Sequence, residues 1–133
     1  METRWTGLEG LEVYQRARQF RNAIYDLSRK LPADERFVLV PQMRRAGLSL
    51  SNNIAEGYGR FHFKESMHFL RTARGSLEEL RDDLSVCRDQ GYVETVILEG
   101  LYEQTDVIRR LINGYIRYLS SQAHSESKVN QKD

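Results

Sequence analysis

The strongest constraint on this chain is the spacing of its apolar residues, which recur three and four positions apart over long stretches. Such residues share one face of an α-helix, and that face can be buried only against another element. No segment of useful length alternates apolar and polar residues with the period of two that a half-buried strand requires. The pattern therefore predicts an all-α fold. The expected core faces are Val13, Ala17, Phe20, Ile24, Leu27 and Leu31; then Leu70, Ala73, Leu77, Leu80, Leu84 and Cys87; then Ile97, Leu101, Thr105, Ile108, Ile112, Tyr115 and Leu119.

Residues that start and stop helices divide the chain into four segments. Thr6 and Glu9 have the spacing of a capping box, and Pro32 disfavours helical geometry in the residue before it, so the first helix is expected from Thr6 to about Leu31. The other helices are expected from about Pro41 to Glu56, from about His62 to Gln90 and from about Val93 to Ser121. Gly57 and Gly59 are expected to end the second helix in the left-handed conformation, and Gly91 to stand at the C-cap of the third.

Short connections between long helices place consecutive helices side by side and antiparallel. The sequence thus predicts an antiparallel up-down-up-down four-helix bundle over residues 1–121. The remaining residues, 122–133, read "QAHSESKVNQKD" and have almost nothing to bury, so we expect a disordered polar tail.

The second segment has one apolar face and one polar face. Its expected core-facing residues are Val40, Met43, Gly47, Leu50 and Ile54, and its polar residues are Arg45, Ser49, Asn52 or Asn53, and Glu56. A glycine inside a helix costs about 1 kcal/mol relative to alanine, so Gly47 predicts the close approach of a neighbouring helix. Gly75, in the middle of the third segment, invites the same interpretation.

Composition narrows the class of protein. The single cysteine, Cys87, rules out a disulfide within one chain and fits a reducing compartment. No run of about eighteen apolar residues is long enough for a membrane span, and the N-terminus lacks the pattern of a signal peptide. We expect a cytoplasmic protein with no membrane contact. The net charge of +1 exerts no overall attraction toward nucleic acid.

The residues do not form a recognisable catalytic or metal-binding pattern. His62 and His68 are poorly spaced for one helix face, and His124 falls in the expected tail. Cys87 continues an apolar face with no evident base beside it, so we expect a core residue rather than a nucleophile. The sequence predicts no enzyme, no metal site and no cofactor.

Three blocks of sequence carry a resemblance to a known family. "QMRRA", "NIAEG" and "ARGSLEEL", in this order, resemble the four-helix-bundle proteins encoded in intervening sequences of ribosomal RNA genes. The accessory variability protein of diversity-generating retroelements is similar to the same group. The resemblance implies a ring-shaped homopentamer, a basic surface that binds RNA or DNA, and a reverse transcriptase as a possible partner.

Arginines of the second and third segments are the candidate nucleic-acid ligands, because guanidinium groups bind phosphate oxygens in a forked geometry. The candidate residues are Arg44, Arg45, Arg60, Lys64, Arg71 and Arg74, with Arg81 farther along the same helix. The alternative is that Arg45 and Arg74 form ion pairs with Glu56 and Glu78, within or between bundles.

Seven tyrosines and Trp5 are many for a bundle of this size. Tyrosine suits surfaces that are dry at one end and wet at the other, so subunit contact is the preferred interpretation and base stacking the alternative. Two functions remain open. One is a self-associating protein that binds nucleic acid through a basic surface, and the other is a protein-interaction scaffold that binds none.

Overall fold

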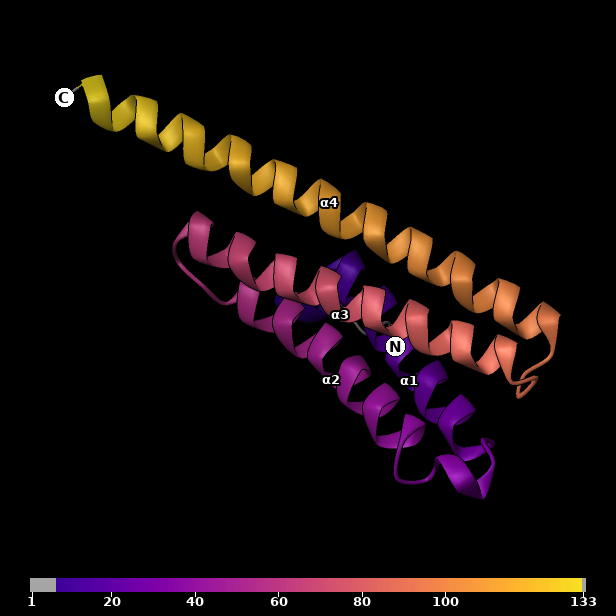
Figure 1. Cartoon of the computed structure of the whole chain (residues 1–133). Helices are drawn as coiled ribbons and strands as arrows, with labels where there is room; N and C mark the ends of the chain where they lie inside the picture. Colours follow the sequence, from indigo (N-terminus) through magenta and orange to yellow (C-terminus); the bar gives the residue numbers. More distant parts are fainter. Residues whose placement is uncertain (1–6, 133) are drawn as a thin grey trace, which may run out of the picture.

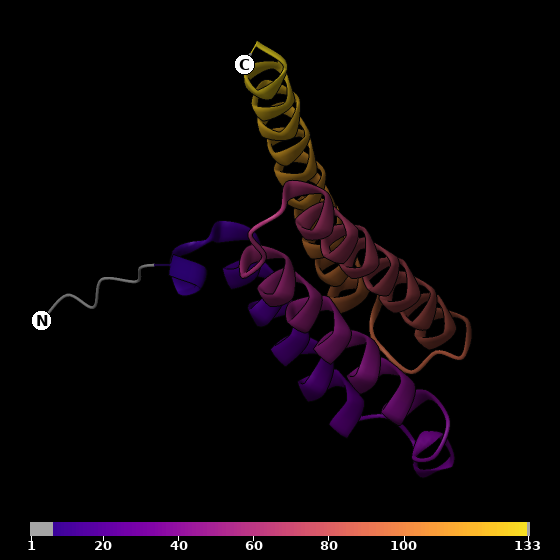
Figure 2. The ribbon, with the colours of Figure 1, turned by 90° about the vertical axis from the view of Figure 1, so that its left-hand side faces the viewer.

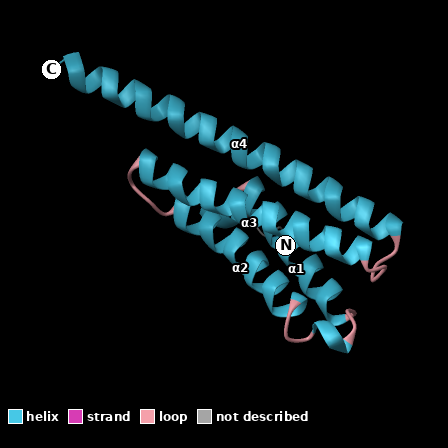
Figure 3. Cartoon of the chain, viewed as in Figure 1, coloured by secondary structure: helices cyan, strands magenta, loops and turns pink. Residues whose placement is uncertain are grey.

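The chain folds into four long α-helices and two short 3-10 helices, as a computed structural model describes for residues 7–132 and for the side chains through Lys128. The α-helices are α1 (Glu12–Arg29), α2 (Leu39–Tyr58), α3 (Phe63–Asp89) and α4 (Thr95–Lys132), and the 3-10 helices are η1 (Gly7–Gly10) and η2 (Ala33–Glu35). The described residues contain no strand (Figure 3). The predicted all-α fold is confirmed.

The helices form a bundle in which the chain reverses direction at each connection (Figure 1). α2 packs against α1 and α3, and α4 packs against α3 and α1, which closes the bundle. α4 is the longest helix, and its C-terminal part rises past the ends of its neighbours (Figure 2). The four-helix arrangement follows from the four apolar faces, because each helix covers the faces of two others.

The core consists of the residues whose spacing predicted it. Phe20, Ile24, Leu50, Ile54 and Leu77 are all 0% exposed, and most other members of the predicted faces are also buried. Burying one such side chain stabilises the fold by about 1.5–3 kcal/mol.

Two predicted core positions are wrong. Val40 is only partly buried, and its neighbour Leu39, at 5% exposure, takes its place in the core. Ile97 is 47% exposed, whereas Leu98 is 3% exposed. Leu98, Leu101, Thr105 and Ile108 keep the alternating spacing of three and four, which the step from Ile97 to Leu101 and then to Thr105 does not. The continuous periodicity therefore decides which of the two neighbours is buried.

The start of the first helix differs from the prediction. Gly7 has φ 62° and belongs to η1, and α1 begins only at Glu12, with Leu11 as its N-cap residue. Thr6, the other half of the expected capping box, lies outside the described residues. The predicted stop before Pro32 is confirmed, because α1 ends at Arg29 and the backbone N–H of Lys30 caps it.

Two of the glycines play roles different from those predicted. α2 continues through Gly57, and Gly59 has φ −81°, so neither takes the left-handed conformation. A Cβ on Gly57 would lie 3.1 Å from the carbonyl oxygen of Ser66, so this glycine lets the start of α3 approach α2. Gly91 has φ 70° and follows α3 as expected.

The two glycines expected to mark close helix contacts behave differently from each other. A Cβ on Gly47 would meet Arg21 Cγ at 3.5 Å, so α1 does approach α2 there. Gly75 is exposed and would meet nothing within 4 Å, so the predicted contact is absent from the described residues.

The C-terminal segment is helical where the sequence predicts disorder. α4 continues to Lys132 and so covers nearly all of residues 122–133. No glycine or proline follows Gly114, and a helix satisfies its backbone hydrogen bonds within itself, so nothing in this stretch terminates it. Residues 124–128 are exposed, so this extension adds no core.

Candidate nucleic-acid interface

Charge is separated along the length of the bundle. In α4, residues 95–106 carry Glu99, Glu103 and Asp106 and no basic side chain. Residues 107–128 carry four basic side chains, Arg109, Arg110, Arg117 and Lys128, against one acidic, Glu126. α3 runs the other way. Its first half has three basic side chains, Lys64, Arg71 and Arg74, against Glu65, and its second half has five acidic ones, Glu78, Glu79, Asp82, Asp83 and Asp89, against Arg81 and Arg88.

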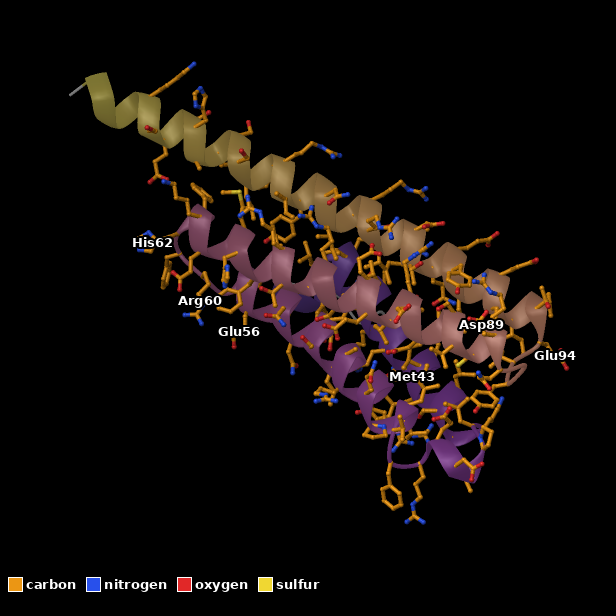
Figure 4. The ribbon with its side chains drawn as sticks, viewed as in Figure 1. Met43, Glu56, Arg60, His62, Asp89 and Glu94 are labelled. Carbon is orange, nitrogen blue, oxygen red and sulfur yellow. The ribbon has the colours of Figure 1, made fainter. Side chains whose placement is uncertain are left out.

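Because α3 and α4 are antiparallel, their basic halves lie together at one end of the bundle and their acidic halves at the other. Figure 4 shows the two ends: Arg60 and His62 lie at the first, Asp89 and Glu94 at the second. We call the second the acidic end. Equal totals of opposite charge in the sequence therefore become two separate regions of potential in the fold.

Side-chain contacts between α3 and α4 fix their register. Arg74 Nη1 donates to Asn113 Oδ1 at 2.8 Å, and Arg109 forms an ion pair with Glu78. Farther toward the acidic end, Arg81 Nη1 forms an ion pair with Asp106 at 3.0 Å. These contacts tie each helix to the other at successive turns.

Four cations gather around the Arg74–Asn113 contact. Arg110 and Arg117 lie one turn before and one turn after Asn113, and Arg71 lies one turn before Arg74, on the same side of the contact as Arg117. Lys64 follows two turns beyond Arg71. We call Lys64, Arg71, Arg110 and Arg117 the basic face. All four are exposed, and none forms an ion pair within the described part of the chain.

Arg110 and Arg117, the two residues that α4 contributes to the basic face, were not among the residues predicted to bind nucleic acid. Arg110 and Arg117 are seven residues apart, so they share one side of the helix, and that side is not the one that carries Ile108 and Ile112. The seven-residue spacing could be read from the sequence. The register between α3 and α4, which brings these arginines beside Arg71, could not.

Arg44 and Arg45 do not join the other candidates. Arg44 lies on the α1 side of α2, where its Nε donates to Ser28 Oγ at 2.9 Å and its guanidinium lies 5.3 Å from the Tyr25 ring centre. Arg45 is exposed near the acidic half of α3, because Gln42, one turn before it, contacts Asp83. Arg44 and Arg45 therefore do not share a surface with Lys64 and Arg71.

Arg60 and Arg74 both have partners within the bundle, and that of Arg74 is Asn113 rather than Glu78. Arg60 pairs with Glu56 at 2.8 Å and with Glu65 at 3.4 Å, and it lies 4.8 Å from the Phe69 ring centre. The predicted pairs of Arg45 with Glu56 and of Arg74 with Glu78 are absent from the described residues, because Glu56 is bonded to Arg60 and Glu78 to Arg109. Of the six predicted residues, Lys64 and Arg71 are the two that belong to the basic face, where both are exposed and form no ion pair within the described residues.

The α2–α3 contact encloses a carboxyl group. Asp83 is 1% exposed; Gln42 Nε2 donates to its Oδ1 at 2.8 Å, and its Oδ2 has no partner. Burial raises the pKa of Asp83 to about 6, with the neighbouring Asp82 and Glu79 adding to the effect and the Gln42 bond opposing it. This group is held inside the packing rather than presented to a ligand.

Cys87 lies one turn farther along α3 and is 0% exposed, which confirms it as a core residue. Burial raises the pKa of its thiol to about 11, and the charges of Asp83 and Glu35 add to the effect. A thiol in this state is a poor nucleophile. Within residues 7–132 no cluster of three or more His, Cys, Asp or Glu side chains is placed to hold a metal ion.

Aromatic side chains divide into two groups. Tyr14, Tyr92, Tyr102 and Tyr115 are partly buried and pack against the core. Tyr58, Phe61 and Tyr118, toward the same end of the bundle as Arg60, are 41%, 97% and 59% exposed. None of the helices in the described part of the chain combines the length and apolarity that crossing a bilayer takes.

Comparison with known proteins agrees with this architecture. A crystal structure at 1.70 Å of a protein with unknown function, from the S23 ribosomal protein family of Bacteroides thetaiotaomicron, superimposes with a TM-score of 0.73 at 22% sequence identity. The match covers 78% of this chain and 97% of that one, and it establishes the shared fold. No curated protein matches the chain. The sequence model of the 23S rRNA-intervening sequence proteins matches residues 9–114, and the chain belongs to this family.

Proposed function

We propose that this protein is a non-enzymatic bundle that self-associates into a ring and binds nucleic acid, RNA or DNA, through its basic face. The observation that carries the proposal is the basic face itself: Lys64, Arg71, Arg110 and Arg117 come from two helices, are exposed and lack ion pairs within the described residues. The neighbouring Arg60 and Arg109 are paired with glutamates, and Arg74 donates to Asn113. The four residues of the basic face are therefore available to an external anion.

Phosphate is the anion that such a face fits best. Guanidinium groups bind phosphate oxygens in pairs of hydrogen bonds, and backbone contacts of this kind carry little sequence preference. Each phosphate contact releases a counterion, so four contacts give an affinity that falls with salt with a logarithmic slope of about −3 to −4. A ring repeats the face in every subunit and raises the overall avidity.

A non-catalytic role is supported by the burial of the reactive groups. Asp83 and Cys87 have strongly raised pKa values, and both are enclosed by helix packing, at 1% and 0% exposure. A substrate would have to separate α2 from α3 to reach either of them.

Self-association is supported by apolar side chains at the acidic end. Phe37, Val38, Val96 and Ile97 are 83%, 63%, 69% and 47% exposed. Phe37 and Val38 lie in the connection before α2, and Val96 and Ile97 lie in the first turn of α4. The two connections at this end are tied together, because Tyr92 Oη donates to Glu35 Oε2 at 2.8 Å. Exposed apolar patches mark protein contacts. The pentamer is the subunit number that the family resemblance implies, and a reverse transcriptase is the alternative protein partner for this patch.

Binding is tested by fluorescence anisotropy with a structured RNA and a duplex DNA over a salt series. The informative variant is Arg71→Glu with Arg117→Glu, and its matched control is Arg18→Glu with Arg45→Glu. The control makes the same change in net charge, at exposed arginines of α1 and α2 that lie off the basic face. We expect the first variant to lose at least about tenfold in affinity and about two units of salt slope, and the control to change little.

Two results would count against nucleic-acid binding. If wild-type protein binds neither probe at low salt, the chain is a protein-interaction scaffold. If both variants lose affinity equally, the effect is one of net charge and the basic face is not a site. Light scattering checks the ring separately, and a monomer at high micromolar concentration would exclude it.

A further inference from the structure

Three exposed aromatic rings lie at the same end of the bundle as the basic face. Phe61 is 97% exposed, Tyr58 is 41% exposed and Tyr118 is 59% exposed. Phe61 stands in the connection between α2 and α3, three residues before Lys64. Phe37 at the acidic end is also exposed, and the remaining phenylalanine and tyrosine rings of the described residues are at least partly buried.

The connection around Phe61 is held in place by its neighbours. Arg60 pairs with Glu56 on α2 and with Glu65 on α3, and its guanidinium lies over the ring of Phe69. Phe69 thus already has a stacking partner in Arg60. Phe61 is left in solvent on an anchored connection.

Tyr58 and Tyr118 come from different helices but share one neighbour. Tyr58 ends α2 and Tyr118 lies on α4, and both lie near Tyr115 of α4. Burial is the main cause that raises the pKa of Tyr115, and the neighbouring Tyr58 and Tyr118 hydroxyls add to it. The rings of Tyr58 and Tyr118 are thus positioned by two helices at one end of the bundle.

An exposed ring next to cations fits one part of a nucleic acid in particular. Its phosphates pair with the cations, and one of its bases stacks on the exposed ring. The faces of bases are free only where the strand is unpaired, because in a duplex they stack on one another. We propose that the basic face binds single-stranded nucleic acid, with an unpaired base stacked on Phe61 and a neighbouring base near Tyr58 and Tyr118, while Lys64, Arg71 and Arg117 contact the phosphates. This inference rests on the proposed function and names the form of nucleic acid that it takes.

The chain contains a matched control. Leu48 is 42% exposed on α2, where it lies beside Arg21 and Tyr25 of α1 and away from the basic face of α3 and α4. Leu48→Ala also removes an exposed apolar side chain, but it changes no ring beside the basic face and none of the residues proposed for self-association. It should therefore leave binding unchanged.

The experiment measures the affinity of the full chain for one labelled RNA strand of mixed sequence, alone and annealed to its complement. Wild-type protein, Phe61→Ala and Leu48→Ala are compared over a salt series. We expect Phe61→Ala to weaken single-strand binding about tenfold with an unchanged salt slope, because stacking is lost and the phosphate contacts stay. Duplex binding should change less than about twofold, and Leu48→Ala should change neither. A 2-aminopurine base in the single strand should be quenched by wild-type protein and not by Phe61→Ala.

Several results would overturn the inference. Equal single-strand affinity of wild-type protein and Phe61→Ala refutes it and leaves the proposed function intact if the arginine variants still lose binding. An equal loss in Leu48→Ala refutes it as well. A changed sedimentation coefficient of Phe61→Ala assigns the ring to a subunit contact instead. Absence of binding to either probe refutes both the inference and the proposed function.

Discussion

Replacement of the buried Asp83 by asparagine should remove a pH dependence from the stability of the fold. The carboxyl group is 1% exposed and its pKa is raised from 3.8 to about 6, chiefly by burial. The folded chain therefore binds this proton more tightly than the unfolded chain. The resulting stabilisation is complete below the unfolded pKa and is lost as the pH rises through about 6.

The magnitude follows from the size of the shift. A difference of about two pKa units, at 1.36 kcal/mol each, corresponds to about 3 kcal/mol. Asparagine cannot ionise, and like the protonated acid it offers an oxygen to Gln42 and leaves one donor without a partner. The two proteins should thus have similar unfolding free energies near pH 3, and Asp83→Asn should be more stable by up to about 3 kcal/mol near pH 7.

The assay is urea unfolding followed by far-ultraviolet circular dichroism, at one protein concentration so that self-association is held constant. Asp82→Asn is the matched control, because Asp82 is the exposed neighbour and its ionisation should matter little. A difference between Asp83→Asn and wild type that is the same at both pH values would refute the reasoning, because it would mean that the carboxyl group is not ionised inside the packing.

Two further predictions concern glycine and cysteine positions. Gly75→Ala should raise the unfolding free energy by about 1 kcal/mol, because this exposed helical position has open space for a methyl group. Gly57→Ala should lower the unfolding free energy by about 1–2 kcal/mol, because its Cβ would press on the Ser66 carbonyl oxygen at 3.1 Å. Urea unfolding checks both, and a gain in stability for Gly57→Ala would contradict the close approach of α3. Cys87 should resist a thiol reagent such as dithionitrobenzoate at mildly alkaline pH until urea unfolds the chain, because its thiol is 0% exposed and burial raises its pKa to about 11. A rapid reaction of the folded protein would show that the α2–α3 packing opens.

The helices could be predicted because their signals are local. Faces such as Phe20–Ile24 and Leu77–Leu80 follow from the 3.6-residue period alone, and Pro32 and Gly91 act on the backbone next to them. A prediction was wrong where the same residue type is compatible with two local structures. Gly57 can end a helix or admit a neighbour, and only the position of Ser66 shows that it admits one.

The candidate site was predicted only in part, because an arginine's partner depends on another helix. Arg44 and Arg45 are adjacent in sequence, yet one bonds Ser28 of α1 and the other is exposed. Arg74 bonds Asn113, which is 39 residues away, rather than Glu78 one turn along its own helix. Spacing along one segment does not contain this information.

The sequence by itself determined the helices, their core faces and the family, because these depend on periodicity and on contiguous motifs. Only the tertiary structure decided which charges are paired, which rings are exposed and where the acidic and basic halves meet. The physical reason is that burial of an apolar face tolerates many partners, whereas an ion pair or a stacked ring requires one neighbour at one distance. That neighbour is set by the register between helices that lie far apart in the chain.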